Sequence, residues 1–142
     1  MPRVSRIKLD KEKMTEMNSN LSFLISSLDK DVDIENFLGE FLTKEEKTML
    51  TKRLVLFMML KRGYTPSVIK SALNVSYETT RTYQNQLGSK SKLFNDMLEK
   101  LISREKTKDL FQKIDKALKP LNLFLESKSN MRSRAKFLSG DY

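Results

Sequence analysis

Six polar side chains between residues 77 and 85 are the part of the chain best suited to chemistry, and that chemistry is hydrogen bonding. Most of them are uncharged groups that both donate and accept, whereas an ordinary surface helix more often alternates Glu and Lys. Arginine can bind guanine, and Gln or Asn can bind adenine, through paired hydrogen bonds. We therefore expect contacts to base edges of double-stranded DNA from Tyr77, Glu78, Thr79, Arg81, Gln84 and Asn85.

Two short helices joined by a tight turn, over residues 65–87, are predicted to carry these side chains. Thr65 can cap the first helix, and Pro66 suits its first position, where no backbone donor is needed. Asn74 tolerates the left-handed backbone at which such a helix ends. Ser76 can cap the second helix. This is the spacing of a helix-turn-helix, and a helical hairpin without a nucleic-acid role is the alternative.

Each of the two predicted helices has a mostly apolar side and a polar side. The inward positions follow helical spacing and are Val68, Ile69, Ala72 and Leu73 in the first helix and Thr80, Tyr83 and Leu87 in the second. Other polar groups are better placed for phosphates, which position a protein on DNA without specifying a sequence. These phosphate candidates are Thr65, Ser67, Lys70 and Ser76.

A longer helix is predicted before this motif, from Thr43 to about Arg62. Thr43 and Glu46 can form a capping box, in which each side chain accepts a hydrogen bond from the other's backbone N–H. Gly63 can end the helix. Because residues 54–60 are all apolar, this helix must be buried on several sides. A second subunit is a natural cover, and the alternative is a central helix in a monomeric core.

The region around the motif resembles the Trp repressor family and its Trp-repressor-like relatives over residues 41–87, FLTKEEKTMLTKRLVLFMMLKRGYTPSVIKSALNVSYETTRTYQNQL. The shared features are a Leu-Thr helix start, a long helix bearing an Arg, an Arg-Gly break and the helix-turn-helix. The resemblance implies an all-α, multi-helix bundle. It also implies a transcriptional repressor that binds operator DNA as an intertwined homodimer.

Two positions depart from what the resemblance implies for a corepressor pocket. Arg53 matches the first arginine that contacts the corepressor in the family, but the second falls at Thr82, which is followed by the bulky Tyr83. Loss of one charge-assisted partner weakens the binding of a carboxylate. We therefore expect Arg53 and Thr82 to mark a possible effector pocket that does not take tryptophan. Alternatively, Arg53 pairs with a carboxylate inside the dimer, since Met49 and Phe57 flank it on an apolar face.

The net charge agrees with a polyanionic partner. The chain has 27 Lys and Arg against 18 Asp and Glu, for a formal net charge of +9. Residues 1–40 carry 6 basic and 8 acidic side chains, whereas residues 41–87 carry 8 and 3. The basic excess therefore begins with the motif region. Proteins that bind ribosomes, RNA or acidic membranes have similar charge, so charge alone does not identify the partner.

Several kinds of site lack their usual residues. The chain has no Cys and no His, and its four Gly are scattered, so the sequence offers no catalytic triad, Cys/His zinc site or phosphate-binding glycine loop. We expect no enzyme activity, no metal and no cofactor. No signal peptide is evident, and the longest apolar run is too short to span a bilayer. A cytoplasmic protein, nucleoid-associated when it binds DNA, is expected.

The chain is predicted to have four parts. A basic arm over residues 1–9 precedes a dimerisation and DNA-binding domain over residues 10–87, whose first helix is expected at Asp10 to Ser27 and the next near Asp33 to Gly39. A helical extension over residues 88–127 carries two apolar stripes, in two helices or one, and Lys119-Pro120 is expected to end the second stripe. Residues 128–142 form a basic tail, which either binds phosphates or is solvated.

These patterns favour a sequence-specific DNA-binding transcriptional regulator, all-helical and homodimeric. One alternative is a helical protein–protein assembly module, because the two apolar stripes exceed what the motif needs. Another is a protein that binds nucleic acid without sequence preference, with a steep salt dependence. Whether a small-molecule effector exists is left open by the sequence.

Overall fold

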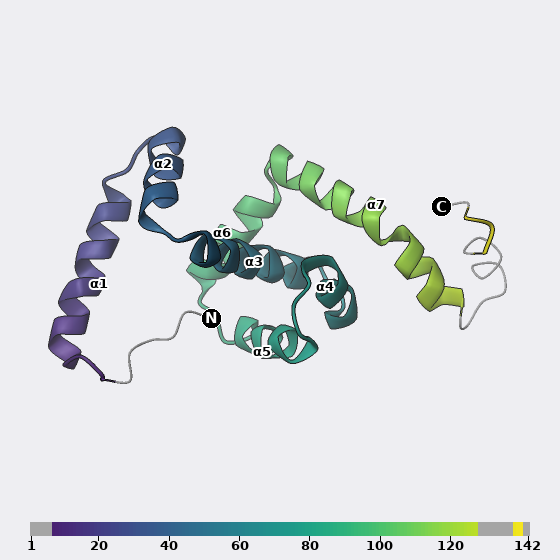
Figure 1. Cartoon of the computed structure of the whole chain (residues 1–142), viewed down its shortest axis with the longest axis horizontal. Helices are drawn as coiled ribbons and strands as arrows, with labels where there is room; N and C mark the ends of the chain where they lie inside the picture. Colours follow the sequence, from purple (N-terminus) through teal and green to yellow (C-terminus); the bar gives the residue numbers. More distant parts are fainter. Residues whose placement is uncertain (1–6, 128–137, 141–142) are drawn as a thin grey trace. The chain divides into compact units, whose positions relative to one another are not determined.

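The computed structural model describes residues 7–127 and 138–140, with the side chains of 121–127 excepted. The architecture is all-helical, as predicted (Figure 1). The helices are α1 (Lys11–Ser26), α2 (Asp31–Phe41), α3 (Lys44–Lys61), α4 (Pro66–Leu73), α5 (Tyr77–Leu87), α6 (Lys92–Ile102) and α7 (Glu105–Ser127). Most of the predicted basic arm, and nearly all of the basic tail, lie outside the described residues.

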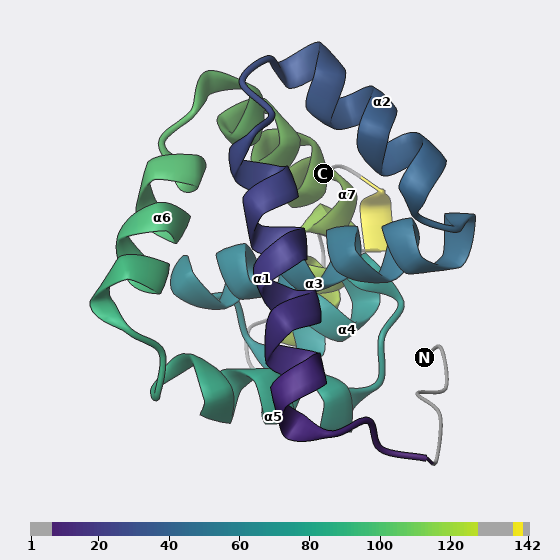
Figure 2. The same ribbon diagram turned by 90° about the vertical axis from the view of Figure 1, so that its left-hand side faces the viewer.

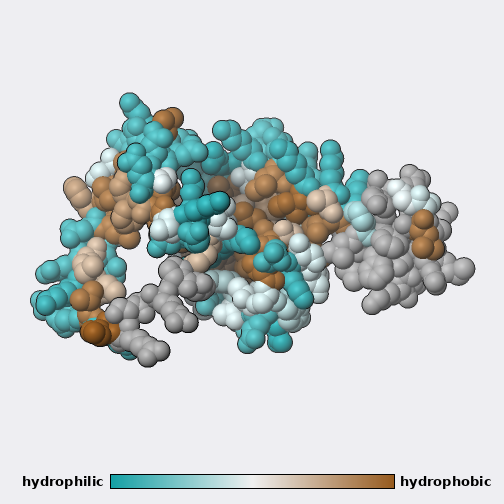
Figure 3. Space-filling model, viewed as in Figure 1, coloured by the Kyte–Doolittle hydropathy of each residue, from teal (hydrophilic) through white to brown (hydrophobic). Residues whose placement is uncertain are grey.

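The chain divides within α3 into two compact units, one ending at Arg53 and the other beginning at Leu54. In the first unit, α1 and α2 are separate helices joined by a short loop (Figure 2). Neither helix contains a buried residue. Apolar side chains are accordingly visible on the surface of this unit (Figure 3). On α1 these exposed side chains are Met14, Met17, Leu21, Phe23, Leu24 and Ile25.

Helix α3 begins with the predicted capping box and ends before the predicted Gly63. The backbone N–H of Thr43 donates to Glu46 Oε2 (2.9 Å), and the N–H of Glu46 donates to Thr43 Oγ1 (3.2 Å), which confirms the capping box. At the other end, Gly63 has a φ of 86°. The Tyr64 N–H returns to the carbonyl of Met59 (3.1 Å), so the chain leaves the helix through a left-handed glycine turn.

The core of the second unit is built around the apolar run of α3. Leu56, Phe57, Met58 and Met59 are buried, whereas Leu54 is 45% exposed. Helices α4, α6 and α7 complete this core with Val68, Ile69, Leu98, Phe111 and Leu118. Each such side chain contributes about 1.5–3 kcal/mol on burial. A single chain therefore covers most of the apolar run.

The carboxyl-terminal region resolves the choice between one helix and two. Helices α6 and α7 are separate, and the break between them is confined to Ser103 and Arg104. The polar residues 105–109, between the two apolar stripes, therefore belong to the start of α7. The prediction that the pattern stops at Lys119-Pro120 was wrong, because α7 continues through Pro120 to Ser127. Proline inside a helix removes one backbone hydrogen bond and crowds the carbonyl four residues before it, yet the helical conformation persists here on both sides of Pro120.

Candidate nucleic-acid interface

The first helix of the predicted motif, α4, begins and ends as its sequence requires. The Val68 N–H donates to Thr65 Oγ1 (3.4 Å), and Pro66 occupies the first helical position. Asn74 has φ 50° and ψ 53°, which is the left-handed conformation that ends the helix. The turn is therefore short and conformationally fixed. It holds α5 beside α4 (Figure 1).

The second helix, α5, is capped by Ser76. The Thr79 N–H donates to Ser76 Oγ (3.0 Å), and the hydroxyls of Ser76 and Thr79 lie 2.6 Å apart in a second hydrogen bond. Two of the hydroxyls expected to contact DNA are thus engaged in closing the helix. A capping hydroxyl can still accept or donate one further bond, so a phosphate contact remains chemically available.

The inward side of α5 is the one predicted. Thr80 is fully buried, and its hydroxyl donates to the carbonyl of Ser76 (3.2 Å). Tyr83 is half-buried, and its ring packs edge-on against that of Phe57, with ring centroids 5.2 Å apart. Leu87 also packs against the core. These three contacts fix the rotation of α5 about its axis.

The rotation of α5 places the polar side chains on its outer face. Most of the predicted base-contacting residues are exposed, and they are Tyr77, Glu78, Arg81, Gln84 and Asn85. Thr79 is half-buried beside its cap. Thr82 is exposed, and its hydroxyl donates to the carbonyl of Glu78 (3.0 Å). The face can therefore present hydrogen-bonding groups along more than two helical turns.

The predicted phosphate-contacting residues lie along α4 and at the start of α5. Thr65, Ser67, Lys70 and Ser76 are all exposed. Thr65 and Ser76 stand at helix N-termini, where unpaired backbone N–H groups and the helix dipole attract anions. The set combines one full positive charge with hydroxyls and helix ends. Such groups can hold a DNA backbone without reading its bases.

Arg53, predicted for the possible effector pocket, is half-buried on α3. Neither Arg53 nor Thr82 lines the cleft described next. The effector pocket stays a prediction.

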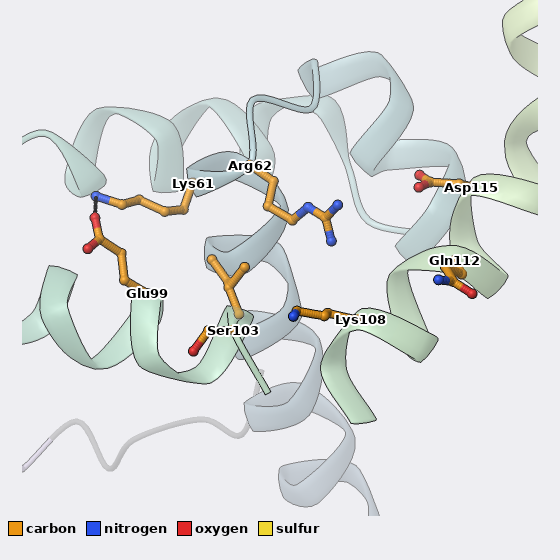
Figure 4. A pocket seen from close by; sticks show the side chains of 8 residues that line it. Lys61, Arg62, Glu99, Ser103, Lys108, Gln112 and Asp115 are labelled. Atoms are coloured by element: carbon orange, nitrogen blue, oxygen red, sulfur yellow. Dashed lines mark ion pairs between the residues drawn. The ribbon is translucent and has the colours of Figure 1, made fainter. Parts of the chain in front are cut away.

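A cleft of about 590 Å³ lies elsewhere in the second unit, and sequence reasoning did not anticipate it (Figure 4). Its lining comes from the end of α3, from α6 and from α7, and consists of Lys61, Arg62, Glu99, Ile102, Ser103, Lys108, Gln112 and Asp115. Local sequence patterns do not predict that residues about 50 positions apart line the same cleft.

Polar contacts connect the cleft to the chain just before α4. Lys61 Nζ lies 3.2 Å from Glu99 Oε1 and donates to Asn95 Oδ1 (3.1 Å). The Tyr64 hydroxyl donates to the carboxylate of Asp115. Burial of the ring, together with this hydrogen bond and the negative charge of Asp115, raises the pKa of Tyr64 to about 12. Tyr64 therefore joins α7 to the turn that leads into α4.

Within the described residues, no helix is long and apolar enough to cross a membrane, and no group of three acidic, His or Cys side chains is placed to hold a metal ion. A family model described as Trp repressor protein matches residues 17–102, which is more than half of the chain. The match ends with α6, so α7 lies outside it. No curated protein and no solved structure matched the chain.

Proposed function

The chain belongs to the Trp repressor family, a family of DNA-binding transcriptional regulators, and from this premise we propose that it reads a specific operator sequence through α5. The observation that carries the proposal is the composition of the outer face of α5. That face is exposed, rich in groups that donate and accept hydrogen bonds, and fixed in rotation by Thr80 and Tyr83. A rigid helix with these groups suits the major groove.

The proposed base contacts come from Tyr77, Glu78, Thr79, Arg81, Gln84 and Asn85. Arg81 is suited to guanine, and Gln84 and Asn85 are suited to adenine. Thr65, Ser67, Lys70 and Ser76 are proposed to contact phosphates and so to set the position of α5 in the groove.

The proposed active form is a homodimer. Its support is the first unit, where α1 carries six large exposed apolar side chains and no buried one. Surfaces of this kind usually belong to an interface. A two-fold dimer would present two copies of α5 to half-sites about one DNA turn, ~34 Å, apart.

We propose a role for each of the four predicted parts of the chain. Residues 10–87 dimerise and bind DNA, residues 88–127 extend the helical core, and the basic arm (1–9) and basic tail (128–142) add contacts to phosphates. We further propose that Arg53 and Thr82 belong to an effector pocket that does not take tryptophan, because only one of the two family arginines is present. Such a regulator would act in the cytoplasm, on the nucleoid.

Selection of bound duplexes from a random library, by the full chain, tests binding, specificity and half-site spacing together. A selected site with two half-sites is the expected result. Binding of all duplexes alike, with a steep salt dependence, would instead indicate a non-specific nucleic-acid binder. Absence of any duplex binding would favour a protein–protein module.

Arg81→Ala then tests the reading helix. We expect a loss of about 1–3 kcal/mol in affinity for the selected site and relaxed preference at one base pair. Arg104→Ala is the matched control, because Arg104 is exposed between α6 and α7. An equal effect of both substitutions would contradict specific reading by α5.

A further inference from the structure

The cleft at the junction of α3, α6 and α7 holds more positive charge than its own carboxylates use. Lys61 is committed to Glu99 and Asn95, and Asp115 accepts from Tyr64. Arg62 and Lys108 remain, and neither forms an ion pair with a carboxylate in the part of the chain that the structure describes. Both side chains extend into the same space, Arg62 from the turn after α3 and Lys108 from α7 (Figure 4). From this arrangement we propose that the cleft binds a small anion.

The guanidinium of Arg62 is held in a way that favours anion binding. Its central carbon lies 4.3 Å from the centroid of the Phe111 ring, and Phe111 is fully buried. This cation–π contact restrains the guanidinium, whose edge carries its N–H donors. Those edge donors match the paired oxygens of a carboxylate or phosphate. Lys108 supplies the second positive charge.

The other walls of the cleft define the ligand class. Ile102 contributes an apolar side, Glu99 and Asp115 contribute carboxylates, and Ser103 contributes a hydroxyl that itself donates to the Lys100 carbonyl (2.7 Å). A volume of about 590 Å³ lies in the range of small-molecule sites. The hydrogen bond from the neutral Tyr64 hydroxyl leaves Asp115 charged, so three cationic side chains face two carboxylates, and the cleft has an excess of one positive charge. A carboxylate or phosphate group of a small metabolite would match this excess.

Occupancy of the cleft would act on the start of the helix-turn-helix. Arg62 is followed directly by Gly63, Tyr64 and Thr65, and Thr65 caps α4. Lys108 lies on α7, the same helix whose Asp115 accepts from Tyr64. A ligand that joins Arg62 to Lys108 would therefore add a second link between α7 and this turn. The site is separate from the proposed pocket at Arg53 and Thr82, and it does not require that the chain bind DNA.

The test is titration of the full chain with inorganic phosphate and, separately, with succinate, at constant ionic strength set by sodium chloride. Backbone amide NMR shifts report where each anion binds. We expect saturable shifts at residues 62–65 and around Lys108, and the tighter of the two probes identifies the phosphate or the dicarboxylate as the better ligand. Shifts that are non-saturable, or spread over all lysines, would show only general attraction to a basic protein and would overturn the proposal.

Lys108→Gln and Lys113→Gln make a matched pair, since both lysines are exposed on α7 and only Lys108 lines the cleft. We expect Lys108→Gln to weaken binding of the better probe about fivefold or more and Lys113→Gln to change it less than about twofold. Arg62→Lys keeps the charge but removes the paired donors, and it should weaken binding by a similar factor to Lys108→Gln. Equal effects of Lys108→Gln and Lys113→Gln would overturn the site.

A second measurement tests whether anion binding also stabilises the turn before α4. With the better probe bound, hydrogen exchange of the backbone amides of Tyr64, Thr65, Ser67 and Val68 should slow, because α7 is then joined to the turn at two points. Unchanged exchange at these amides, with binding intact, would overturn the coupling to α4.

Discussion

Helix α1 and the pair α4–α5 differ in capping and in burial. α1 has 16 residues, many of them apolar, yet it buries none, and its N-cap residue Asp10 makes no side-chain capping bond. α4 and α5 have only 8 and 11 residues, yet both are capped by a hydroxyl. They also place Val68, Ile69 and Thr80 in the core. The short helices are thus fixed by their surroundings, and the long one is not.

The difference is that the six exposed apolar side chains of α1, here called its apolar stripe, are not buried within the described residues. A helix of about 15 residues is marginal in water without tertiary packing. The apolar stripe of α1 therefore has a physical reason to bind a second copy of the chain, whereas α4 and α5 already have their packing within one unit. The proposed DNA-reading element is pre-organised, and the proposed dimerising element is the one that changes on association.

Ile69→Ala should have the largest effect on this comparison. Ile69 is fully buried, so the substitution removes apolar contacts and leaves a cavity. We expect the free energy of unfolding to fall by about 2–5 kcal/mol, measured by urea denaturation. The loss should not depend on protein concentration if α4 is supported within its own chain. A loss that disappears on dilution would place Ile69 at an interface and break the comparison.

Leu21→Ser should act on association instead. Leu21 is 42% exposed in the middle of the α1 stripe. If a second copy covers the stripe, the substitution costs about 1.5–3 kcal/mol of association free energy, or roughly tenfold or more in the dimer dissociation constant. Sedimentation equilibrium measures this constant. Leu110→Ser is the control, because Leu110 is 39% exposed on α7, outside the proposed interface. Equal weakening by both variants would contradict a specific role for α1.

Ser76→Ala and Asp10→Ala test the caps that distinguish the two regions. Ser76 accepts from the Thr79 N–H, so its loss should lower the free energy of unfolding by about 0.5–2 kcal/mol. Asp10 makes no side-chain capping bond, so Asp10→Ala should change stability by less than Ser76→Ala. Thermal unfolding followed by circular dichroism compares the two. A larger effect at Asp10 would mean that α1 is the better-fixed helix.

Local signals predicted the fold of the motif well. Thr65, Pro66, Asn74 and Ser76 act through backbone neighbours within four residues, and hydroxyl caps and left-handed Asn depend on that local geometry alone. The inward side of α5 could be predicted for the same reason, because helical spacing decides which side chains share a face. Which of the outer side chains touch DNA stays a prediction.

The parts that could not be predicted depend on distant contacts. Tyr64 and Asp115 are 51 residues apart, and Arg62 reaches Phe111 across a similar separation. No periodicity or cap encodes such a meeting, so the cleft was missed. The continuation of α7 through Pro120 was missed because proline is a general helix breaker, and this general rule does not weigh the helix on either side.

The smallest predicted effect concerns the long-range contact that the α4–α5 region has through Tyr64. Its pKa is raised from 10.0 to about 12, chiefly by burial, then by the hydrogen bond to Asp115 and the negative charge of that group. The folded chain thus keeps the Tyr64 proton at a pH where the unfolded chain releases it. This contribution to stability is complete below pH 10 and is lost as the pH rises from 10 towards 12.

Tyr64→Phe tests this contribution, because the variant has no proton to release at this position. The stability difference between the natural chain and the variant should therefore shrink between pH 9 and about pH 10.5, measured by urea unfolding. All other ionisable groups are common to both chains, so their contributions cancel in the difference. Tyr77→Phe is the control, since Tyr77 is 46% exposed on the outer face of α5. If the difference for Tyr77→Phe shrank equally, the contact between Tyr64 and Asp115 would not be what fixes the entry to α4, and the contrast with α1 would rest on the caps and Ile69 alone.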